Sequence, residues 1–465
     1  MSLHYDPTNL SAELVGAAHG LSAEEVQAAE PVAAGALAGF RRSFEEGRYG
    51  FPALPAEKKL IQEIAAFAKS VAGSYDTVCV VGIGGSALGA WALDCGLRGP
   101  HPVQGGPSAK NPRLVILDNV DPVFIANALK SMNPKKTLVV PIAKSGSTAE
   151  TMATFLVVHA WLKEALGAKK SLKHLVIVTS EARGDLKKFA VENKLPTFHI
   201  PENVGGRFSV LSAVGLVPAA LIGIDIRKLC QGAAAMTAQC WSEDLNENIA
   251  LRSALHHYLI WTKRKKSIQV VFPYANHLWG VAFWFRQLWA ESLGKAKNRK
   301  GKKVNVGQTP VAALGTTDQH SQVQLYMEGP NDKVFTFLAA GKWAETGKIG
   351  KEKTGYDSFD YLAGHSLASL IDAERVATAA ALTANARPNC TLTVDKVDEA
   401  HLGALLQFFE FQTAFVGEML DIDAFDQEGV ELGKRFTFGL MGRAGYEQFL
   451  EEFKAYEAKR ATVKL

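Results

Sequence analysis

The chain has 465 residues, of which 47% are apolar and 21% are charged, a composition that excludes a disordered chain and predicts two or three globular domains. The formal net charge is only +4, and the basic residues are dispersed except in residues 295–303, which we expect to form a solvated loop, so nucleic acid is not the expected partner. The most apolar stretch, residues 210–224, is too short and too interrupted to span a bilayer. The N-terminal sequence MSLHYDPTNL lacks the pattern of a signal peptide, and we therefore expect a cytoplasmic protein.

The cysteines indicate neither a disulfide framework nor a zinc site. The chain contains five of them, namely Cys79, Cys95, Cys230, Cys240 and Cys390. They lie far apart, show no C-x-x-C spacing and mostly occupy apolar runs, as reduced thiols in a protein core do.

The first predicted elements along the chain are helices. The residues before Pro55 have a helical pattern, and Ser22 followed three residues later by Glu25 matches a capping box, in which each side chain binds the other residue's backbone N–H. We therefore assign residues 1–55 to an N-terminal helical extension.

Short apolar runs then alternate with longer helical segments. The runs are DTVCVVG, RLVILD, TLVVPIA and HLVIVTS, at residues 76–82, 113–118, 137–143 and 174–180. This alternation is typical of a parallel sheet covered by helices. It predicts a first α/β domain over residues 56–225.

The same alternation recurs after a helical stretch at residues 226–266. The later runs are SIQVVFP, TPVAALG and KVFTFLAA, at residues 267–273, 309–315 and 333–340. Long helical segments return after Glu399. The sequence therefore predicts an α/β fold with two doubly wound, parallel-sheet lobes, the second over residues 226–420, and a C-terminal helical segment over residues 421–465.

The turn after the first apolar run has the features of a phosphate site. In open α/β sheets, ligands bind beyond the carboxyl ends of the strands. Here the sequence GIGGS follows the strand, and its glycines, including Gly85, allow the backbone to approach a ligand closely. Ser86 then opens a helix, whose first N–H groups can hold an anion.

A second turn, AKSGSTAET at residues 143–151, has the same character. It supplies one cation, Lys144, and the hydroxyls of Ser145, Ser147 and Thr148. Glycine and serine are also common in turns without any ligand, so either turn alone has two interpretations. Two such turns in one sheet favour a phosphate.

A dinucleotide site is a competing interpretation of the first turn. Gly82, Gly84 and Ala87 fit the G-x-G-x-x-A pattern, which requires an acidic residue about 20 positions further on. The sequence there, RGPHPVQGG, has no acid, and the next carboxylate after Asp94 is Asp118, about 30 positions beyond the glycines. A dinucleotide is therefore not favoured.

The third turn, at residues 201–215, places Arg207 after two glycines and before an apolar run. An arginine keeps its charge at all accessible pH values and can stabilise an oxyanion that develops on a substrate. A structural ion pair is the alternative role.

Six segments together resemble phosphoglucose isomerases. The sugar-phosphate segments of that family are similar to GIGGS, KSGSTAET and ENVGGRFS, and its C-terminal signature to FDQEGVELGK at residues 425–434. WAESLGK at residues 289–295 and GTTDQHSQ at residues 315–322 resemble the regions of its catalytic glutamate and histidine. The segments follow the family's order. The resemblance implies two sugar isomerase domains with helical extensions, and the length resembles the compact bacterial form.

The resemblance implies reversible isomerisation of glucose 6-phosphate and fructose 6-phosphate, without a metal or organic cofactor. Glu291 would transfer a proton between C2 and C1, and Arg207 would balance the charge of the enediolate. His320 would open the sugar ring, because an imidazole exchanges protons in both directions near neutral pH. Lys434 would assist ring opening or position the substrate.

The resemblance also implies how the phosphate binds. Ser86, Ser145 and Thr148 would hold it, with Lys144 and Gln427 nearby and a backbone group of Gly206. Many family members carry a serine at the position of Ala143, so one hydroxyl is absent here, and Ser147 or a backbone N–H is expected to substitute.

In the family the histidine reaches the neighbouring subunit's site, so the resemblance implies a homodimer with His320 contributed across the interface. Two other functions remain as alternatives. A non-catalytic sugar-phosphate sensor would keep the phosphate-binding residues without the catalytic ones, and a nucleotide-dependent oxidoreductase would use the Gly82 turn.

Overall fold

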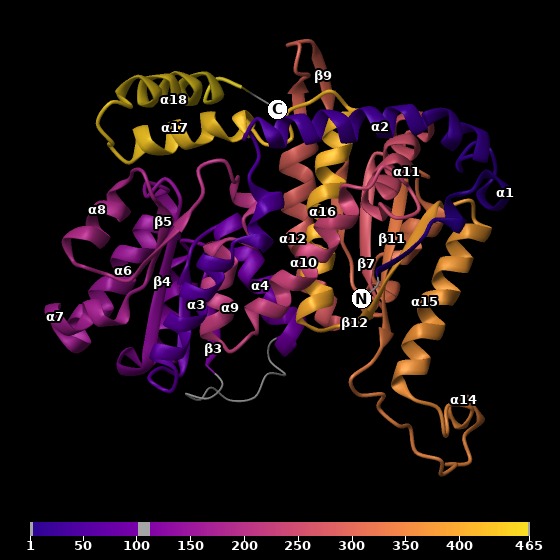
Figure 1. Cartoon of the computed structure of the whole chain (residues 1–465), viewed down its shortest axis with the longest axis horizontal. Helices are drawn as coiled ribbons and strands as arrows, with labels where there is room; N and C mark the ends of the chain where they lie inside the picture. Colours follow the sequence, from indigo (N-terminus) through magenta and orange to yellow (C-terminus); the bar gives the residue numbers. More distant parts are fainter. Residues whose placement is uncertain (1–2, 101–111, 464–465) are drawn as a thin grey trace. The chain divides into compact units, whose positions relative to one another are not determined.

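The computed structural model describes residues 3–100 and 112–463, and it contains two largely parallel sheets (Figure 1). The first sheet has the strand order β3-β2-β4-β5-β6 and is parallel throughout. Its strands are β2 (Thr77–Val81), β3 (Arg113–Leu117), β4 (Thr137–Ala143), β5 (Ile177–Ser180) and β6 (Thr197–Ile200). The four predicted runs form β2 to β5, whereas β6 was not predicted. Because β2 and β4 are buried at every position, they have no polar alternation.

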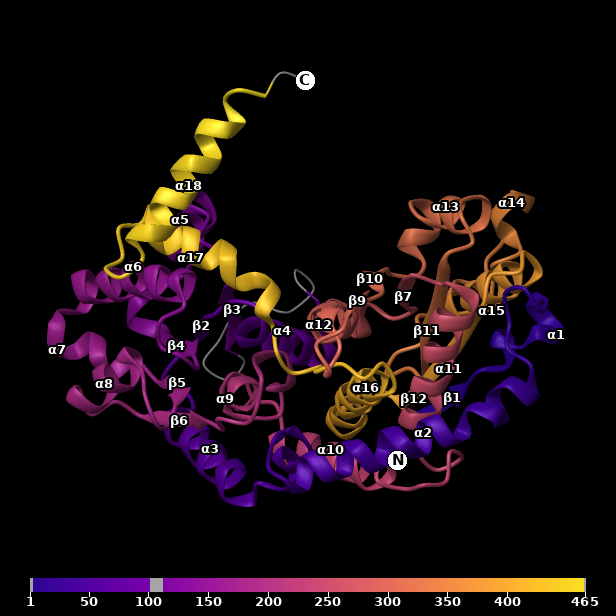
Figure 2. The same ribbon diagram turned by 90° about the horizontal axis from the view of Figure 1, so that it is seen from above.

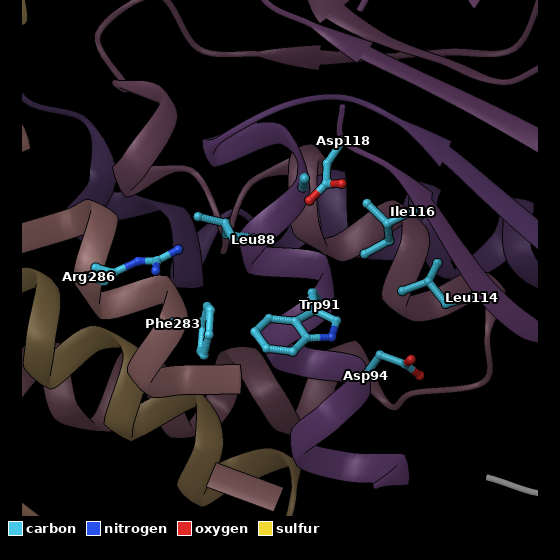
Figure 3. Close-up of a pocket in the computed structure, with 9 residues that line it drawn as sticks. Leu88, Trp91, Asp94, Leu114, Ile116, Asp118, Phe283 and Arg286 are labelled. Atoms are coloured by element: carbon cyan, nitrogen blue, oxygen red, sulfur yellow. The ribbon is translucent and has the colours of Figure 1, made fainter. Parts of the chain in front are cut away.

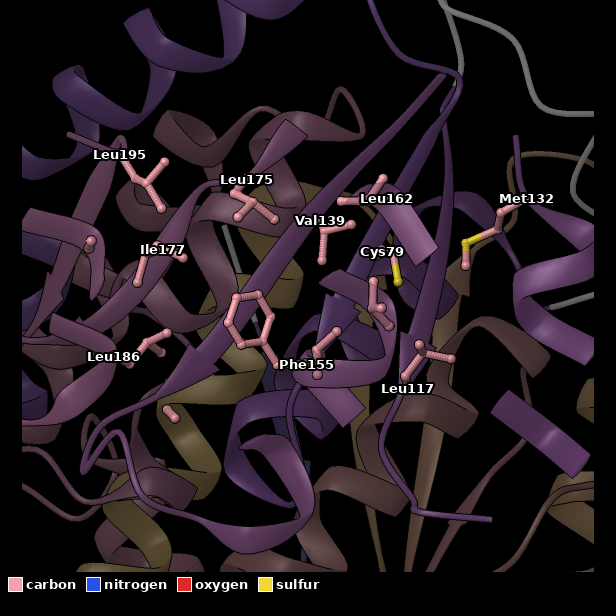
Figure 4. Packing of buried hydrophobic residues seen from close by; sticks show 14 residues of the cluster. Cys79, Leu117, Met132, Val139, Phe155, Leu162, Leu175, Ile177, Leu186 and Leu195 are labelled. Atoms are coloured by element: carbon pink, nitrogen blue, oxygen red, sulfur yellow. The ribbon is translucent and has the colours of Figure 1, made fainter. Parts of the chain in front are cut away.

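Helices connect these strands and bury the faces of the sheet. They include α3 (Lys58–Val71), α4 (Gly85–Arg98), α5 (Pro122–Ser131), α6 (Ala149–Leu166), α8 (Asp185–Glu192) and α9 (Ala213–Leu221). One apolar cluster joins Cys79, Val139 and Ile177 of the strands to Phe155 and Leu162 of α6 (Figure 4). Burial of each Val, Ile, Leu or Phe side chain contributes about 1.5–3 kcal/mol, so this cluster holds α6 against the sheet.

The second sheet has the order β1-β12-β11-β7-β10. Its strands are β1 (Leu3–Asp6), β7 (Ile268–Pro273), β10 (Thr309–Ala312), β11 (Lys333–Lys342) and β12 (Asn389–Lys396). All neighbours are parallel except β1, which pairs antiparallel with β12 at the edge. The prediction of a wholly helical N-terminal extension is therefore wrong. The strand was missed because β1 has four residues with only one of them buried, so it shows no apolar run. The capping box of Ser22 and Glu25 is confirmed at the start of α2 (Ala23–Glu45).

A layer of long helices lies between the sheets (Figures 1 and 2). This layer contains α10 (Ile226–Cys240), α11 (Ile249–Arg264), α12 (Asn276–Leu293) and α16 (Glu399–Met419). The long helix α15 (Leu367–Ala384) instead packs against β11 and β12 on the other face of the second sheet (Figure 2). In α16, every residue from Leu402 to Gly417 is buried. A helix that is mostly apolar all round belongs in the interior of a large protein, and α16 accordingly packs against α10, α11 and α12.

The basic residues 295–303 form a hairpin and not the predicted loop. Strands β8 (Lys295–Lys297) and β9 (Lys303–Val306) pair antiparallel, and Gly301 takes a positive φ of 77° in the turn between them. The hairpin directly follows α12 and projects from the rest of the chain (Figure 1). Main-chain hydrogen bonds hold the two strands together, so the hairpin could not be predicted from an apolar pattern in the sequence.

The chain divides into two compact units, Met1–Ala424 and Phe425–Leu465. The second unit contains η7 (Glu428–Val430), α17 (Glu431–Leu440) and α18 (Glu447–Arg460), and Phe436 of α17 packs against Phe453 of α18. All five cysteines are buried and free, as predicted. Among the residues described, none of the helices combines the length and apolarity needed to cross a membrane.

Candidate active site

The strand order of the first sheet brings the two predicted phosphate turns side by side. The chain passes from β2 outward to β3 and then returns to β4 on the other side of β2, so the topological switch point lies between β2 and β4. Ligands of open α/β sheets bind beyond the carboxyl ends of the strands at such a point. The turns that carry Ser86 and Lys144 follow these two strands.

Close packing explains the glycines of the first turn. Gly84 has a positive φ of 59°, and a Cβ there would lie 2.8 Å from Nε2 of Gln287. A Cβ on Gly85 would lie 2.1 Å from the carbonyl oxygen of Gly206. The first turn therefore rests directly on the third turn and on α12. The backbone N–H of Ser86 donates to the carbonyl of Ile83 at 3.2 Å, which leaves the hydroxyl as the group that Ser86 can offer to a ligand.

The second turn presents its hydroxyls at the start of α6. The hydroxyl of Ser147 donates to that of Ser145 at 3.2 Å, and Thr148 is the N-cap residue without using its side chain as a cap. Nζ of Lys144 donates to the carbonyl oxygens of Glu202 and Val204 at 2.5 and 3.0 Å, which ties this turn to the third one. Partial burial lowers the pKa of the Lys144 ammonium group.

Arg207 and Glu291 come together, although 84 positions separate them in the sequence. Nη1 of Arg207 lies 3.5 Å from Oε2 of Glu291. The guanidinium also donates to Oγ of Ser292 at 2.7 Å and to the carbonyl oxygen of Ala424 at 2.6 Å. The Arg207 side chain is 1% exposed and the Glu291 side chain 33%. The pair thus combines a fixed, desolvated cation with a carboxylate that stays accessible from one side.

Gln287 belongs to the same cluster and was not predicted. It lies one helical turn before Glu291 on α12, and its Nε2 donates to Oε1 of Glu291 at 3.1 Å. Its Oε1 is buried and has no hydrogen-bond partner within residues 3–100 and 112–463. The spacing of four residues predicts that Gln287 and Glu291 lie on the same face of a helix. The sequence does not show that this face of α12 meets Arg207.

His320 is not joined to this cluster. It ends η6 (Thr317–His320), is exposed, and forms no side-chain hydrogen bond or ion pair with Glu291 or Arg207 in the described part of the chain. Its neighbours hold the segment in place: Oδ2 of Asp318 accepts from the N–H of Leu314 at 2.7 Å, and Nε2 of Gln319 donates to the Tyr274 hydroxyl at 2.7 Å. The His320 imidazole is therefore exposed to solvent, while hydrogen bonds of the neighbouring residues hold its backbone segment in place.

Lys434 and Gln427 belong to the second compact unit, Phe425–Leu465. Lys434 lies on α17, and its Nζ binds Oε1 of Glu431 at 2.8 Å. Gln427 directly precedes η7 as its N-cap residue. Both side chains therefore sit near the start of the short helical segments of that unit.

A separate cavity of about 390 Å³ is lined by α4, β3 and α12 (Figure 3). Trp91 and Phe283 form its aromatic wall, and the guanidinium of Arg286 lies 4.6 Å from the Phe283 ring centroid. Asp118, the carboxylate considered for a dinucleotide, also lines it, and partial burial raises the pKa of that carboxyl group. Glu291 does not line the cavity, whereas Ala87 and Leu88, which follow the glycine turn, do. The N–H of Gly82 donates to the carbonyl of Leu117 at 3.4 Å, so Asp118 lies beside the glycine turn, and only its spacing in the sequence disfavours a dinucleotide.

Comparison with known proteins gives the family of the chain. The sequence model of the family described as phosphoglucose isomerase matches residues 55–455. A glucose-6-phosphate isomerase of Carboxydothermus hydrogenoformans is 44% identical over 427 residues, which cover 90% of each chain. The solved structure of a hypothetical protein from Thermus thermophilus gives a TM-score of 0.85 at 35% identity and covers 96% of this chain and 100% of that one. A glucose-6-phosphate isomerase from Chlamydia trachomatis gives 0.73 at 26% identity, with 86% and 77% covered. The chain belongs to the phosphoglucose isomerase family.

Proposed function

We propose that the chain interconverts glucose 6-phosphate and fructose 6-phosphate through ring opening and an enediolate. The observation that carries this proposal is the Arg207–Glu291 pair at the carboxyl end of the first sheet, beside two turns suited to a phosphate. The names of the relatives identify the same reaction. A non-catalytic sensor is not favoured, because a sensor has no use for an accessible carboxylate held against a buried guanidinium.

Glu291 serves as the base of the proposed reaction. Its carboxylate removes the proton from C2 of the open-chain sugar and returns it to C1, while the carbonyl moves from one carbon to the other. Gln287 donates to one carboxylate oxygen and Arg207 lies beside the other, so the group is held in one orientation. The guanidinium of Arg207 also stabilises the negative charge of the enediolate, and its buried setting strengthens that interaction.

The phosphate is held by the turns at the switch point. We assign this role to the hydroxyls of Ser86, Ser145, Ser147 and Thr148, to the charge of Lys144, and to backbone groups of Gly85 and Gly206. Binding of the unreactive phosphate fixes the reacting carbons against Glu291. Ala143 is 3% exposed and belongs to the apolar core cluster, so its methyl group packs inside the sheet. The proposed anion contacts therefore begin at Lys144.

His320 opens the sugar ring in the site of a second subunit, and Lys434 assists it. Two features support this part of the proposal: His320 is exposed, and within the described residues its side chain forms no bond with Glu291 or Arg207. Gln427 would contact the phosphate. The protein would then act as a homodimer in the cytoplasm.

Conversion of fructose 6-phosphate by Glu291→Gln tests the proposal. Product is measured with a coupled glucose-6-phosphate dehydrogenase, and Glu192→Gln, which alters an exposed glutamate on α8, is the matched control. Loss of the base is expected to lower kcat by about 10²–10⁴-fold. Thermal stabilisation by fructose 6-phosphate should persist in Glu291→Gln, and the control should behave as wild type. Undiminished turnover in Glu291→Gln would exclude this residue as the base, and absent wild-type turnover despite stabilisation would support the sensor.

A further inference from the structure

The hairpin β8–β9 carries four exposed lysines: Lys297, Lys300, Lys302 and Lys303. None of their side chains forms a hydrogen bond or ion pair with another described residue. Four unpaired positive charges therefore lie within seven consecutive residues.

Other residues of the hairpin fasten it to the end of α16. Both terminal nitrogens of Arg299 donate to the carboxylate of Glu418, one of them at 2.6 Å. The N–H of Arg299 donates to the carbonyl of Asp421 at 2.8 Å, and Nδ2 of Asn298 donates to the Asp421 carboxylate at 3.1 Å. The arginine charge is thus neutralised by a partner, whereas the charges of the lysines are not. The anchor also fixes where the lysines stand.

The hairpin stands close to the proposed base. Glu291 lies in the last turn of α12, and β8 begins two residues after that helix ends. At about 1.5 Å per helical residue and about 3.3 Å per strand residue, the backbone of Lys297 lies within roughly 16 Å of Glu291 and that of Lys300 within roughly 26 Å. At such separations the lysine charges can act on a hexose phosphate that approaches Glu291.

We infer that the β8–β9 lysines steer the phosphate of the incoming substrate toward the site, an inference that rests on the proposed function. A sugar phosphate carries close to two negative charges at neutral pH, and a local positive potential raises the rate at which such a ligand encounters the protein. The Debye length is about 30 Å at 0.01 M salt and about 10 Å at 0.1 M. Steering therefore acts on kcat/KM at low ionic strength and fades as salt is added, while kcat does not change.

The test compares two fourfold Lys→Gln variants with wild type. The first replaces Lys297, Lys300, Lys302 and Lys303. The control replaces Lys135, Lys136, Lys169 and Lys170, which are also exposed but precede β4 and β5 and therefore lie toward the amino ends of the strands. Both variants lose the same net charge. The values of kcat and kcat/KM for fructose 6-phosphate are measured at about 10 and about 200 mM ionic strength, on either side of the range where screening sets in, and size-exclusion chromatography checks the assembly of each variant.

The hairpin variant is expected to lose about threefold to tenfold in kcat/KM at the low salt concentration, with kcat unchanged and the difference nearly abolished at the high one. The control variant should stay close to wild type at both salt concentrations. Equal losses in the two variants would overturn the inference in favour of a net-charge effect. A loss that persists at high salt, or a changed elution volume, would overturn it in favour of a structural role. Wild-type turnover is the separate test of the proposed function.

Discussion

Glu410 is a buried carboxyl group that makes the stability of the chain depend on pH. It lies in α16 with 0% exposure, and neither carboxyl oxygen has a hydrogen-bond partner among the residues that the structure describes. Burial raises the pKa of this carboxyl group well above its usual value, because the low-dielectric interior disfavours the charged form. The folded chain therefore holds a proton that the unfolded chain releases above its ordinary carboxyl pKa.

This difference sets the sign of a pH dependence. Between the unfolded and the folded pKa, the folded state binds more protons, so the free energy of unfolding falls as pH rises, by up to about 1.4 kcal/mol for each pH unit. Glu410→Gln removes the titrating group and should gain stability relative to wild type as pH rises above the ordinary carboxyl pKa. Thermal unfolding midpoints over a series of pH values measure the effect, with Glu192→Gln as the exposed control. Parallel profiles of wild type and Glu410→Gln would contradict it.

At the scale of elements, α10 and α16 pack so closely that glycine is required where they cross. A Cβ on Gly232 would lie 1.7 Å from the carbonyl oxygen of Ala400, and a Cβ on Gly403 would lie 2.0 Å from that of Leu229. Neither obstacle is a flexible side-chain end, so the helices would have to separate. The segment after α16 contains Ala424, whose carbonyl oxygen accepts a hydrogen bond from Arg207. The position of α16 at this crossing therefore helps to position Arg207.

Gly403→Ala tests the crossing against an equivalent change at an open position. The variant should lose about 1–3 kcal/mol of stability through overpacking. Gly35→Ala in α2 is the matched control, because nothing lies within 4 Å of its added Cβ. That variant should gain about 0.5–1 kcal/mol, since alanine favours a helix over glycine. Denaturant unfolding of both proteins gives the values, and a similar shift in the two would show that the crossing tolerates a methyl group.

Elements with a continuous apolar run were predictable, and those without one were not. The runs of β2, β4, β5, β7 and β11 reflect burial on both faces of parallel sheets, whereas β3 and β10 are apolar edge strands that are only partly buried. By contrast, β6 and β12 alternate buried and partly exposed positions, β1 has one buried residue, and β8 and β9 have none. Their strand character comes from pairing with a neighbouring strand, which an apolar run does not record.

At the scale of the whole molecule, the candidate active site is assembled from positions far apart in the chain. The sequence predicted Arg207 and Glu291 because each lies in its own recognisable motif, and the contact between them is confirmed. Gln287 and Ser292 were not predicted, because their roles depend on which faces of α12 meet the third turn. His320 stays a prediction, since its proposed partners belong to another copy of the chain.

Mixing two inactive variants tests this shared site. In a heterodimer of Glu291→Gln and His320→Ala, one site would contain both changes and the other neither. Random exchange of subunits should therefore restore about a quarter of wild-type activity, because half of the dimers are mixed and each has one intact site. The variants are unfolded and refolded together and separately before turnover is measured. No recovery on mixing, with heterodimers demonstrated by differently tagged chains, would place His320 and Glu291 in one subunit.

The pairing of β1 with β12 has a consequence for how the protein is made. Leu3 faces Val394 in this pair, so the two strands leave the ribosome at nearly opposite ends of synthesis. At about 5–20 residues per second, β1 waits roughly 20–80 s for its partner. Unpaired strand edges are where chains associate wrongly during that interval. The second sheet is therefore completed only after β12 has been translated, and β1 stays without its partner strand until then.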